Sequence, residues 1–567
     1  MQRAPRLRGV RHIEGHFQTS APAIPERLDS WKEIARHLRR TVRTVQRWEA
    51  LGLPVYRHGH VAGSSVYAYR AELDRWWTAP GPVEATEGAP DHLAGGPGVP
   101  RVAVLPFTNL GPGSDAAHFS EGFVDELITA LASSPGIVVV SRTSVMQFRD
   151  RPSIPVKQVA SLLSVSLLVE GALQRHGDEV LVTVRLVDPF DAGRVIWGQR
   201  YGCLHPEVRQ LQAQVAADIA RHAAGRGGSD GPSQPQAARR VNPEAQEAYL
   251  MGRFYLHKRA ATSLLAALER FGQAVAFDPS DARGYAGLAE TYALLSGNEF
   301  WTPEAGFPKA REAAQQALDR DPNNAVAHAS LGMVRALYEW RWDEAEREFG
   351  RAIELSPNYA DAWHWCGMVR LMAGRVEASI APLDRAVELD PLSPVIAVNA
   401  GRPLHFLQQY DGAIGRCNHA LSFAPGFWLA HINRAFAYSA QGDAQRAIDA
   451  ARSAVEWSKG NGAAILALAE AHAVAGDAPS ALAVIDHVAA RLGESGTAYA
   501  SAFRVARVFA RLGERERAFA WLARSMQERS LGNATYMPLD PALDSLRGDS
   551  RFAGVLQALN LTKEVRT

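Results

Sequence analysis

The sequence predicts a multidomain, mostly α-helical fold in three parts: a small basic head, a small α/β module with a mixed sheet, and a long α-solenoid. Three observations support this prediction. Stretches rich in Gly and Pro interrupt the chain at 79–100 and 226–243, and prolines recur about every 34 residues in the last half. Between the two stretches, strand-like and helix-like patterns alternate. At 567 residues the chain is long enough for about three or four domains.

Positive charge is concentrated in the head. Residues 1–80 hold 14 Lys or Arg and 7 Asp or Glu, although the whole chain has a net charge of +1. A basic head on a mildly acidic body favours a negatively charged partner for the head. The three cysteines are too few for a disulfide framework, and neither a signal peptide nor a membrane-spanning run is evident. We therefore expect a cytoplasmic protein with no membrane partner.

Residues 26–78, after a flexible tail at 1–25, have the pattern of a winged helix-turn-helix. Ser30 to Glu33 has the form of a capping box, which begins a helix. A second helix is expected over 41–49, capped by Thr41 and basic on its outer face. Residues 55–60 and 66–69 alternate in polarity on either side of a Gly/Ser turn, as in a two-stranded wing.

The segment WKEIARHLRRTVRTVQRWEALGLP resembles the winged helix-turn-helix of the MerR and excisionase-like families. The resemblance implies binding to double-stranded DNA, with base-edge contacts separate from phosphate contacts. Base edges would be contacted by Arg43, Thr44 and Gln46, and phosphates by Arg47, Arg57 and His58. MerR-type regulators follow the wing with a long coiled-coil helix, whereas here the linker 79–100 follows. A dimer built on that helix is not expected, and homo-oligomerisation through another part of the chain stays open.

Residues 101–225 alternate between strands and helices. Strands are expected at 101–107, 137–140, 167–174, 179–187 and 194–201, and helices at 121–132, 159–163 and 206–224. The phrases VAVLPFTNL, HFSEGFVDELITAL and RVIWGQRY resemble the TolB amino-terminal-like module. That resemblance implies no enzymatic activity. With the linker 226–243 after it, the module is expected to be a spacer or adaptor.

Residues 244–530 are repetitive. Pro279, Pro322, Pro357, Pro391 and Pro425 end successive units, and the last three spacings are 35, 34 and 34 residues. A period of about 34 residues ending in proline indicates stacked helix pairs. The pattern resembles the tetratricopeptide family, which implies a superhelix with a concave groove. We expect about seven repeats, followed by a cap at 531–567.

The groove supplies the candidate partner site. Asn399 and Asn433 lie 34 residues apart, at equivalent positions on the first helices of adjacent repeats, and Arg402 follows three residues after Asn399. Paired amides there would hold a peptide backbone, which offers donors and acceptors. The alternative is a solvated groove or an internal cap.

The leading hypothesis is a DNA-binding transcriptional regulator whose solenoid binds a protein or peptide. The alternative is a non-catalytic interaction scaffold whose helix-turn-helix head does not bind DNA. The sequence contains no GxxxxGK[ST], HExxH or GxSxG motif, so we expect no enzyme. It also has no metal-ligand cluster, and we expect neither a metal nor a cofactor.

Overall fold

The computed structural model divides into two compact units, residues 1–97 and 98–567. It describes residues 27–28, 30–38, 42, 45, 55–57, 66–70, 73, 99–111, 114–149, 151, 154–225, 242–298, 300–491, 501–529 and 536–561.

The first unit contains a helix and a small antiparallel sheet. Helix α1 (Trp31–His37) begins where Ser30 accepts a hydrogen bond from the Glu33 amide at 3.2 Å, as the capping box predicted. Strand β3 (Val66–Tyr69) lies between β1 (Arg27–Leu28) and β2 (Tyr56–Arg57). The β2–β3 pair coincides with the predicted wing, whereas the sequence did not predict β1. The described core residues are Leu28, Ile34, Ala35, Leu38, Val45, Val66, Ala68 and Leu73.

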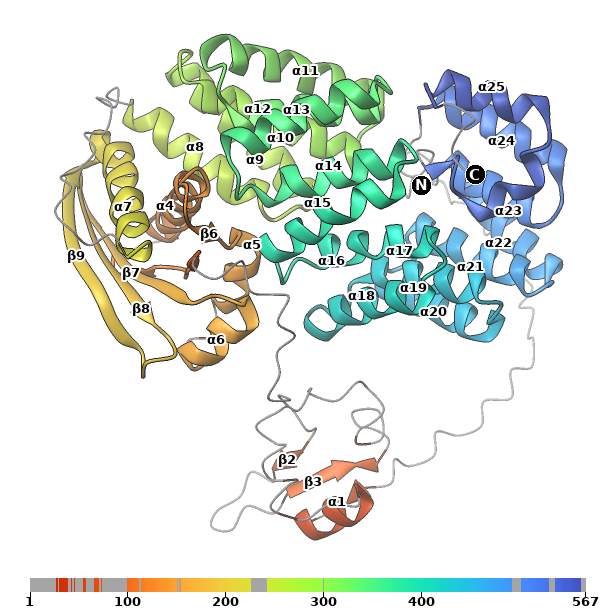
Figure 1. The fold of residues 1–567 in the computed structure, drawn as a ribbon, viewed down its shortest axis with the longest axis horizontal. Helices are drawn as coiled ribbons and strands as arrows, with labels where there is room; N and C mark the ends of the chain where they lie inside the picture. The colour runs from red at the N-terminus through yellow and green to blue at the C-terminus, as the bar shows by residue number, and fades with distance from the viewer. Residues whose placement is uncertain are drawn as a thin grey trace, which may run out of the picture. The chain divides into compact units, whose positions relative to one another are not determined.

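The second unit begins with a mixed α/β module. Its sheet has the order β6-β4-β7-β8-β9, and β5 also pairs with β7. Strand β4 runs parallel to β6 and β7, whereas β7, β8 and β9 form an antiparallel meander. The strands are β4 (Arg101–Val104), β5 (Thr108–Asn109), β6 (Val138–Val139), β7 (Leu167–His176), β8 (Glu179–Asp188) and β9 (Arg194–Leu204). The helices are α4 (Ser114–Ala132), α5 (Arg142–Val145), α6 (Val156–Leu163) and α7 (Val208–Ala223), and α4 and α7 pack against each other and the sheet (Figure 1).

The first predicted strand is shorter than expected. Strand β4 ends at Val104, not at Phe107. The Phe107 ring lies where a side chain on Gly171 would be, since a Cβ there would be 2.6 Å from Phe107 Cζ. The chain therefore leaves the strand before Phe107, and the Phe107 ring covers β7. This ring lies near Phe123, with a ring-centre separation of 6.2 Å.

The solenoid follows as eight helix pairs in the described residues, one more than the sequence suggested. They are α8 (Pro243–Leu256) with α9 (Ala261–Phe277), α10 (Ala282–Gly297) with α11 (Pro303–Arg320), α12 (Ala325–Leu337) with α13 (Trp342–Leu355), α14 (Ala360–Met372) with α15 (Val376–Leu389), α16 (Pro394–Ala400) and α17 (Arg402–Phe406) with α18 (Tyr410–Phe423), α19 (Trp428–Ala440) with α20 (Ala444–Trp457), α21 (Gly462–Val474) with α22 (Ala478–Arg491), and α23 (Ala502–Arg511) with α24 (Arg515–Gln527). The 3-10 helix η5 (Pro541–Leu546) and α25 (Ser550–Ala558) end the described chain.

The α/β module packs directly on the solenoid, so it is more than a spacer. The Asn358 side-chain amide donates to the Ile137 carbonyl at 3.1 Å, and the Ser141 amide donates to the Leu389 carbonyl at 2.8 Å. Gly122 on α4 lets α8 approach, because a Cβ there would lie 2.7 Å from Leu250 Cβ. One apolar core runs from the sheet through α4 and α7 into the first repeats. Of the predicted linker 226–243, residues 226–241 lie outside the described residues.

A buried ionic cluster reinforces this interface. Asp125 on α4 is 3% exposed and accepts a hydrogen bond from Arg253 Nε of α8 at 2.6 Å. His257 Nε2 and Arg142 Nε lie 3.0 and 3.8 Å from the same carboxylate. Burial raises the pKa of Asp125, but the facing charge of Arg253 and the hydrogen bond with His257 outweigh burial and hold the pKa well below its usual range. The carboxylate is therefore ionised and fully partnered.

Candidate partner-binding cavity

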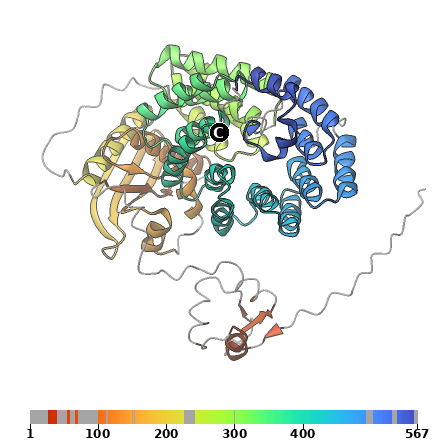
Figure 2. The same cartoon turned by 45° about the vertical axis from the view of Figure 1, so that its right-hand side comes forward.

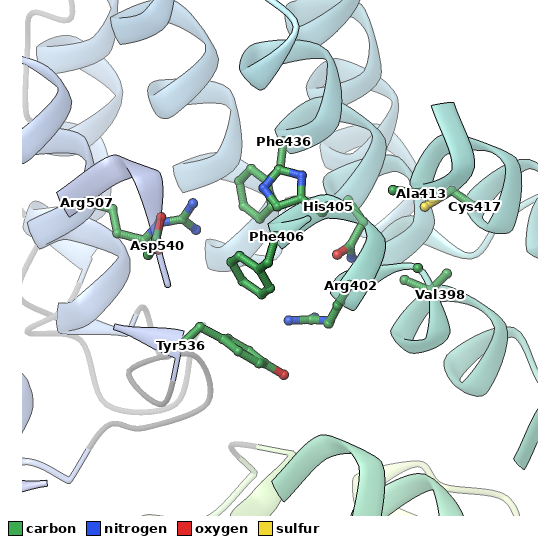
Figure 3. Close-up of a pocket in the computed structure, with 12 residues that line it drawn as sticks. Val398, Arg402, His405, Phe406, Ala413, Cys417, Phe436, Arg507, Tyr536 and Asp540 are labelled. Carbon is green, nitrogen blue, oxygen red and sulfur yellow. The ribbon is translucent and has the colours of Figure 1, made fainter. Parts of the chain in front are cut away.

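A cavity of about 50 Å³ lies inside the solenoid where the fifth and sixth repeats face the C-terminal segment. This volume accommodates a few water molecules or one small group. The lining residues come from α16 to α19, from α23 and from the segment before η5 (Figure 3). They are Val398, Gly401, Arg402, His405, Phe406, Ala413, Cys417, Asn433, Phe436, Arg507, Tyr536 and Asp540.

A break in the first helix of the fifth repeat shapes one wall. The sequence predicted a single helix here, but α16 ends at Ala400 and α17 begins at Arg402. Pro403 has no amide hydrogen to donate and disfavours a helical conformation at the residue before it. Gly401 also allows close packing, because a Cβ there would be 3.2 Å from the Ala413 carbonyl oxygen. The break directs Arg402 and His405 into the cavity.

Arg402 is positioned by a chain of polar contacts. Its Nε donates to Asn399 Oδ1 at 2.8 Å, and Asn399 Nδ2 lies 2.8 Å from His364 Nε2. Burial lowers the pKa of His364 to about 4, so the ring is neutral near pH 7 and accepts the amide hydrogen. Asn399 thus lies behind Arg402 and orients it.

An aromatic ring faces the guanidinium of Arg402. The guanidinium lies 5.1 Å from the centre of the Tyr536 ring, and that ring is 5.6 Å from the Phe406 ring. Burial raises the pKa of the Tyr536 hydroxyl, which keeps it neutral. This arrangement favours a cation–π contact in a partly desolvated site.

The opposite side of the cavity holds a second cation. Arg507 is 8% exposed, and its guanidinium lies 2.8 Å from Asp540 and 3.0 Å from Glu470. Burial lowers the pKa of Arg507, but these two carboxylates outweigh burial and raise it. The same guanidinium stacks on Phe436 at 4.4 Å. Burial lowers the pKa of His405 to about 4, so near pH 7 the two arginines are the cations of the lining.

The structure separates the three predicted partner-binding residues. Arg402 and Asn433 line the cavity, whereas Asn399 is not among its lining residues. Asn433 Nδ2 donates to the Leu429 carbonyl of its own helix at 2.8 Å. Asn399 instead contacts His364 and Arg402, so the two amides do not line the cavity together. Arg507, Tyr536 and Asp540 were missed because they lie more than 70 residues beyond Asn433 and share no repeat position with it.

Most of the predicted DNA-binding residues fall outside the described part of the chain. Those residues are Thr41, Arg43, Thr44, Gln46, Arg47 and His58. Arg57 belongs to β2 and its backbone pairs with Val66. Their roles stay predictions.

Residues 438–504 match the tetratricopeptide repeat family. This match runs from the end of α19 to the start of α23, and the solenoid as a whole is tetratricopeptide-like. The chain is 27% identical over 253 residues to "Putative adenylate cyclase 3" of Rhizobium meliloti (strain 1021), which covers 44% of this chain and 42% of that protein. It is 29% identical over 143 residues to the transcriptional regulator HilA of Salmonella typhimurium, which covers 25% of this chain and 26% of that protein. The chain thus spans less than half the length of either relative.

Solved structures also align with part of the chain. Pseudomonas aeruginosa PilF is 18% identical and has a TM-score of 0.31, covering 38% of this chain and 93% of its own. A tetratricopeptide repeat protein of Parabacteroides merdae is 14% identical and has a TM-score of 0.34. The alignment covers 45% of this chain and 95% of that protein. No helix among the described residues is long and apolar enough to cross a membrane.

Proposed function

We propose that the protein is a DNA-binding transcriptional regulator whose solenoid binds a protein or peptide partner. The observation that carries the proposal is a basic head with helix-turn-helix patterning on a chain that carries tetratricopeptide repeats and is partly similar to the regulator HilA. Tetratricopeptide repeats support protein interaction. The regulatory role and the DNA contact are inferences.

In this proposal the head binds the major groove. Arg43, Thr44 and Gln46 contact base edges, and Arg47, Arg57 and His58 contact phosphates. One small head buries little surface and binds weakly by itself. Partner-driven clustering, or homo-oligomerisation, raises the effective concentration of heads and supplies the missing affinity.

The TolB-like module then provides rigid support for the solenoid. The buried Asp125 cluster and the continuous core support this role. A cytoplasmic location agrees with the free thiols of Cys203, Cys366 and Cys417. We infer no catalytic role, since the likeness to the cyclase-named relative spans 42% of that protein and the sequence has none of the catalytic motifs named above.

The proposed DNA binding is tested by mixing the full chain with a pool of random duplexes at several salt concentrations. The duplexes that the protein retains are then sequenced. We expect an enriched motif and an affinity that falls steeply with salt. Arg43→Glu with Arg47→Glu should abolish retention. Arg200→Glu with Arg515→Glu is the matched control, because both arginines are exposed on the second unit and the charge change is the same. No retention of the wild type even at low salt would leave the interaction scaffold as the function.

The proposed partner binding is tested by selecting displayed random peptides for binding to the full chain. Arg402→Ala with Asn433→Ala should lose the selected peptides, because both residues line the cavity. Equal enrichment by this variant would place the partner site elsewhere.

A further inference from the structure

The C-terminal segment 536–561 makes two kinds of contact. With its sequence neighbours it forms a cap, in which Ser545 Oγ donates to the Ala510 carbonyl of α23 at 3.2 Å. It also reaches repeats far away in the sequence. Trp342 Nε1 donates to the Leu559 carbonyl at 2.8 Å, and Asn560 Nδ2 donates to the Trp340 carbonyl at 3.1 Å. The blue C-terminal helices accordingly lie beside the green helices of the third repeat in Figure 2.

The beginning of this segment forms one wall of the cavity described above. Tyr536 and Asp540 are each 5% exposed, and both point into the cavity in Figure 3. The Tyr536 ring packs on Phe406 and faces Arg402, and the Asp540 carboxylate pairs with Arg507. An aromatic ring and a carboxylate four residues apart thus satisfy the two cations of the cavity.

The Tyr536 contact is more than capping requires. A cap covers the apolar end of the last helix pair, and Leu543, Leu546 and Phe552 are buried in the core that includes α23 and α24. Tyr536 instead contacts α17, in the fifth repeat, three repeats before the end of the solenoid. The Tyr536 ring thus already lies against the guanidinium of Arg402, 5.1 Å from it.

We propose that residues 536–540 are an internal ligand of the partner groove, and that the external partner is a peptide presenting an aromatic side chain and, four residues later, a carboxylate. This inference rests on the partner half of the proposed function. The partner displaces Tyr536 and Asp540 and takes over their contacts with Phe406, Arg402 and Arg507. Because the internal segment is tethered, its effective concentration is about millimolar, and a free peptide competes at a disadvantage.

The test uses a fluorescein-labelled peptide of residues 535–543, TYMPLDPAL, and fluorescence anisotropy with full-length proteins. The wild type is compared with the Tyr536→Leu/Asp540→Asn variant. Leucine keeps the apolar filling and loses the ring. Asparagine keeps the side-chain oxygen that caps η5 by accepting from the Ala542 amide, but it loses the charge that pairs with Arg507.

We expect the variant to bind the peptide at least tenfold more tightly than the wild type does. A peptide with alanine for its tyrosine and asparagine for its aspartate should not bind. Adding Arg402→Ala to the variant should remove the gain. Asp544→Asn is the matched control, because this exposed carboxylate pairs with Arg547 and does not line the cavity. Equal affinity of the variant and the wild type would overturn the inference and leave the segment a cap.

A second measurement does not depend on the variant folding. Saturating peptide should accelerate hydrogen exchange of wild-type amides in 544–561, which the peptide itself lacks, and unchanged exchange would also overturn the inference. If only the internal-ligand idea fails, the wild type still selects displayed peptides and Arg402→Ala/Asn433→Ala still loses them. If the proposed partner binding itself is wrong, replacing Arg402 changes the binding of no peptide.

Discussion

At the scale of single residues, burial of charge decides which side chains matter for stability. An exposed ion pair contributes little because water already solvates both partners, whereas a buried charge without its partner is costly. Asp125 and Asp191 illustrate the two cases. Asp125 is buried among Arg253, His257 and Arg142, and Asp191 pairs with Arg194 at 2.7 Å on the surface.

Asp125→Ala should lower the free energy of unfolding by about 3–5 kcal/mol, because it leaves buried cations without their carboxylate. Asp191→Ala removes an equally short but exposed pair and should cost less than about 1 kcal/mol. Urea denaturation of both variants at pH 7 checks the difference. Similar losses for the two would contradict the buried-charge explanation.

Asp390 gives stability a distinct dependence on pH. Burial raises the pKa of Asp390 to about 7, although the Ser144 hydroxyl donates to its carboxylate at 2.5 Å and opposes the shift. In the unfolded chain the pKa is about 3.9. Between these values the folded chain keeps a proton that the unfolded chain has released. The contribution of Asp390 to stability is therefore complete below about pH 4, and it falls by up to about 1.4 kcal/mol per pH unit until about pH 7.

Asp390→Asn cannot ionise, so its stability relative to the wild type should rise between about pH 4 and 7 and level off above that. Urea titrations at pH 5, 6, 7 and 8 measure the change. Asp384→Asn is the control, because this carboxylate lies in the same repeat and pairs with Arg416 on the surface. Parallel pH profiles for the wild type and Asp390→Asn would contradict the prediction.

At the scale of helices, small residues decide how closely the two helices of a repeat pack. Gly367 on α14 faces α15, and a Cβ there would lie 2.6 Å from Leu383 Cγ and 3.0 Å from the Ser379 carbonyl oxygen. Gly350 on α13 faces open space, with no atom within 4 Å of such a Cβ. The same residue type therefore has a packing role in one helix and none in the other.

Gly367→Ala should destabilise the protein by about 1–3 kcal/mol, because α15 must move away from α14. Gly350→Ala should stabilise it by about 0.5–1 kcal/mol, since alanine favours the helix and meets nothing. Thermal melts followed by circular dichroism at 222 nm measure both. The prediction fails if both substitutions shift the midpoint in the same direction.

At the scale of the second unit, the α/β module and the first repeats share one core and should open together. Gly122→Ala places a methyl group 2.7 Å from Leu250 Cβ, at the contact of α4 with α8. Hydrogen exchange of slow amides in β8 and α10 should accelerate by the same factor, because both contribute residues to the shared core. Gly272→Ala on α9 is the control, since nothing lies within 4 Å of its Cβ. Acceleration in β8 alone would show that the module opens independently.

Sequence reasoning predicted the repeats and the main strands of the α/β module along the chain, and it proposed Arg402 and Asn433 as partner-binding residues, a role that stays a prediction. These features are encoded locally, in proline spacing, in apolar periodicity and in equivalent repeat positions. The contact of Asp125 with Arg253, which lies 128 residues away, and the contact of Tyr536 with Phe406 arise from the tertiary fold and could not be predicted from the sequence. Such contacts depend on the curvature of the solenoid and on which earlier repeats its C-terminal end contacts. Local periodicity contains no information about either, because it specifies which face of a helix is buried but not which distant segment covers it.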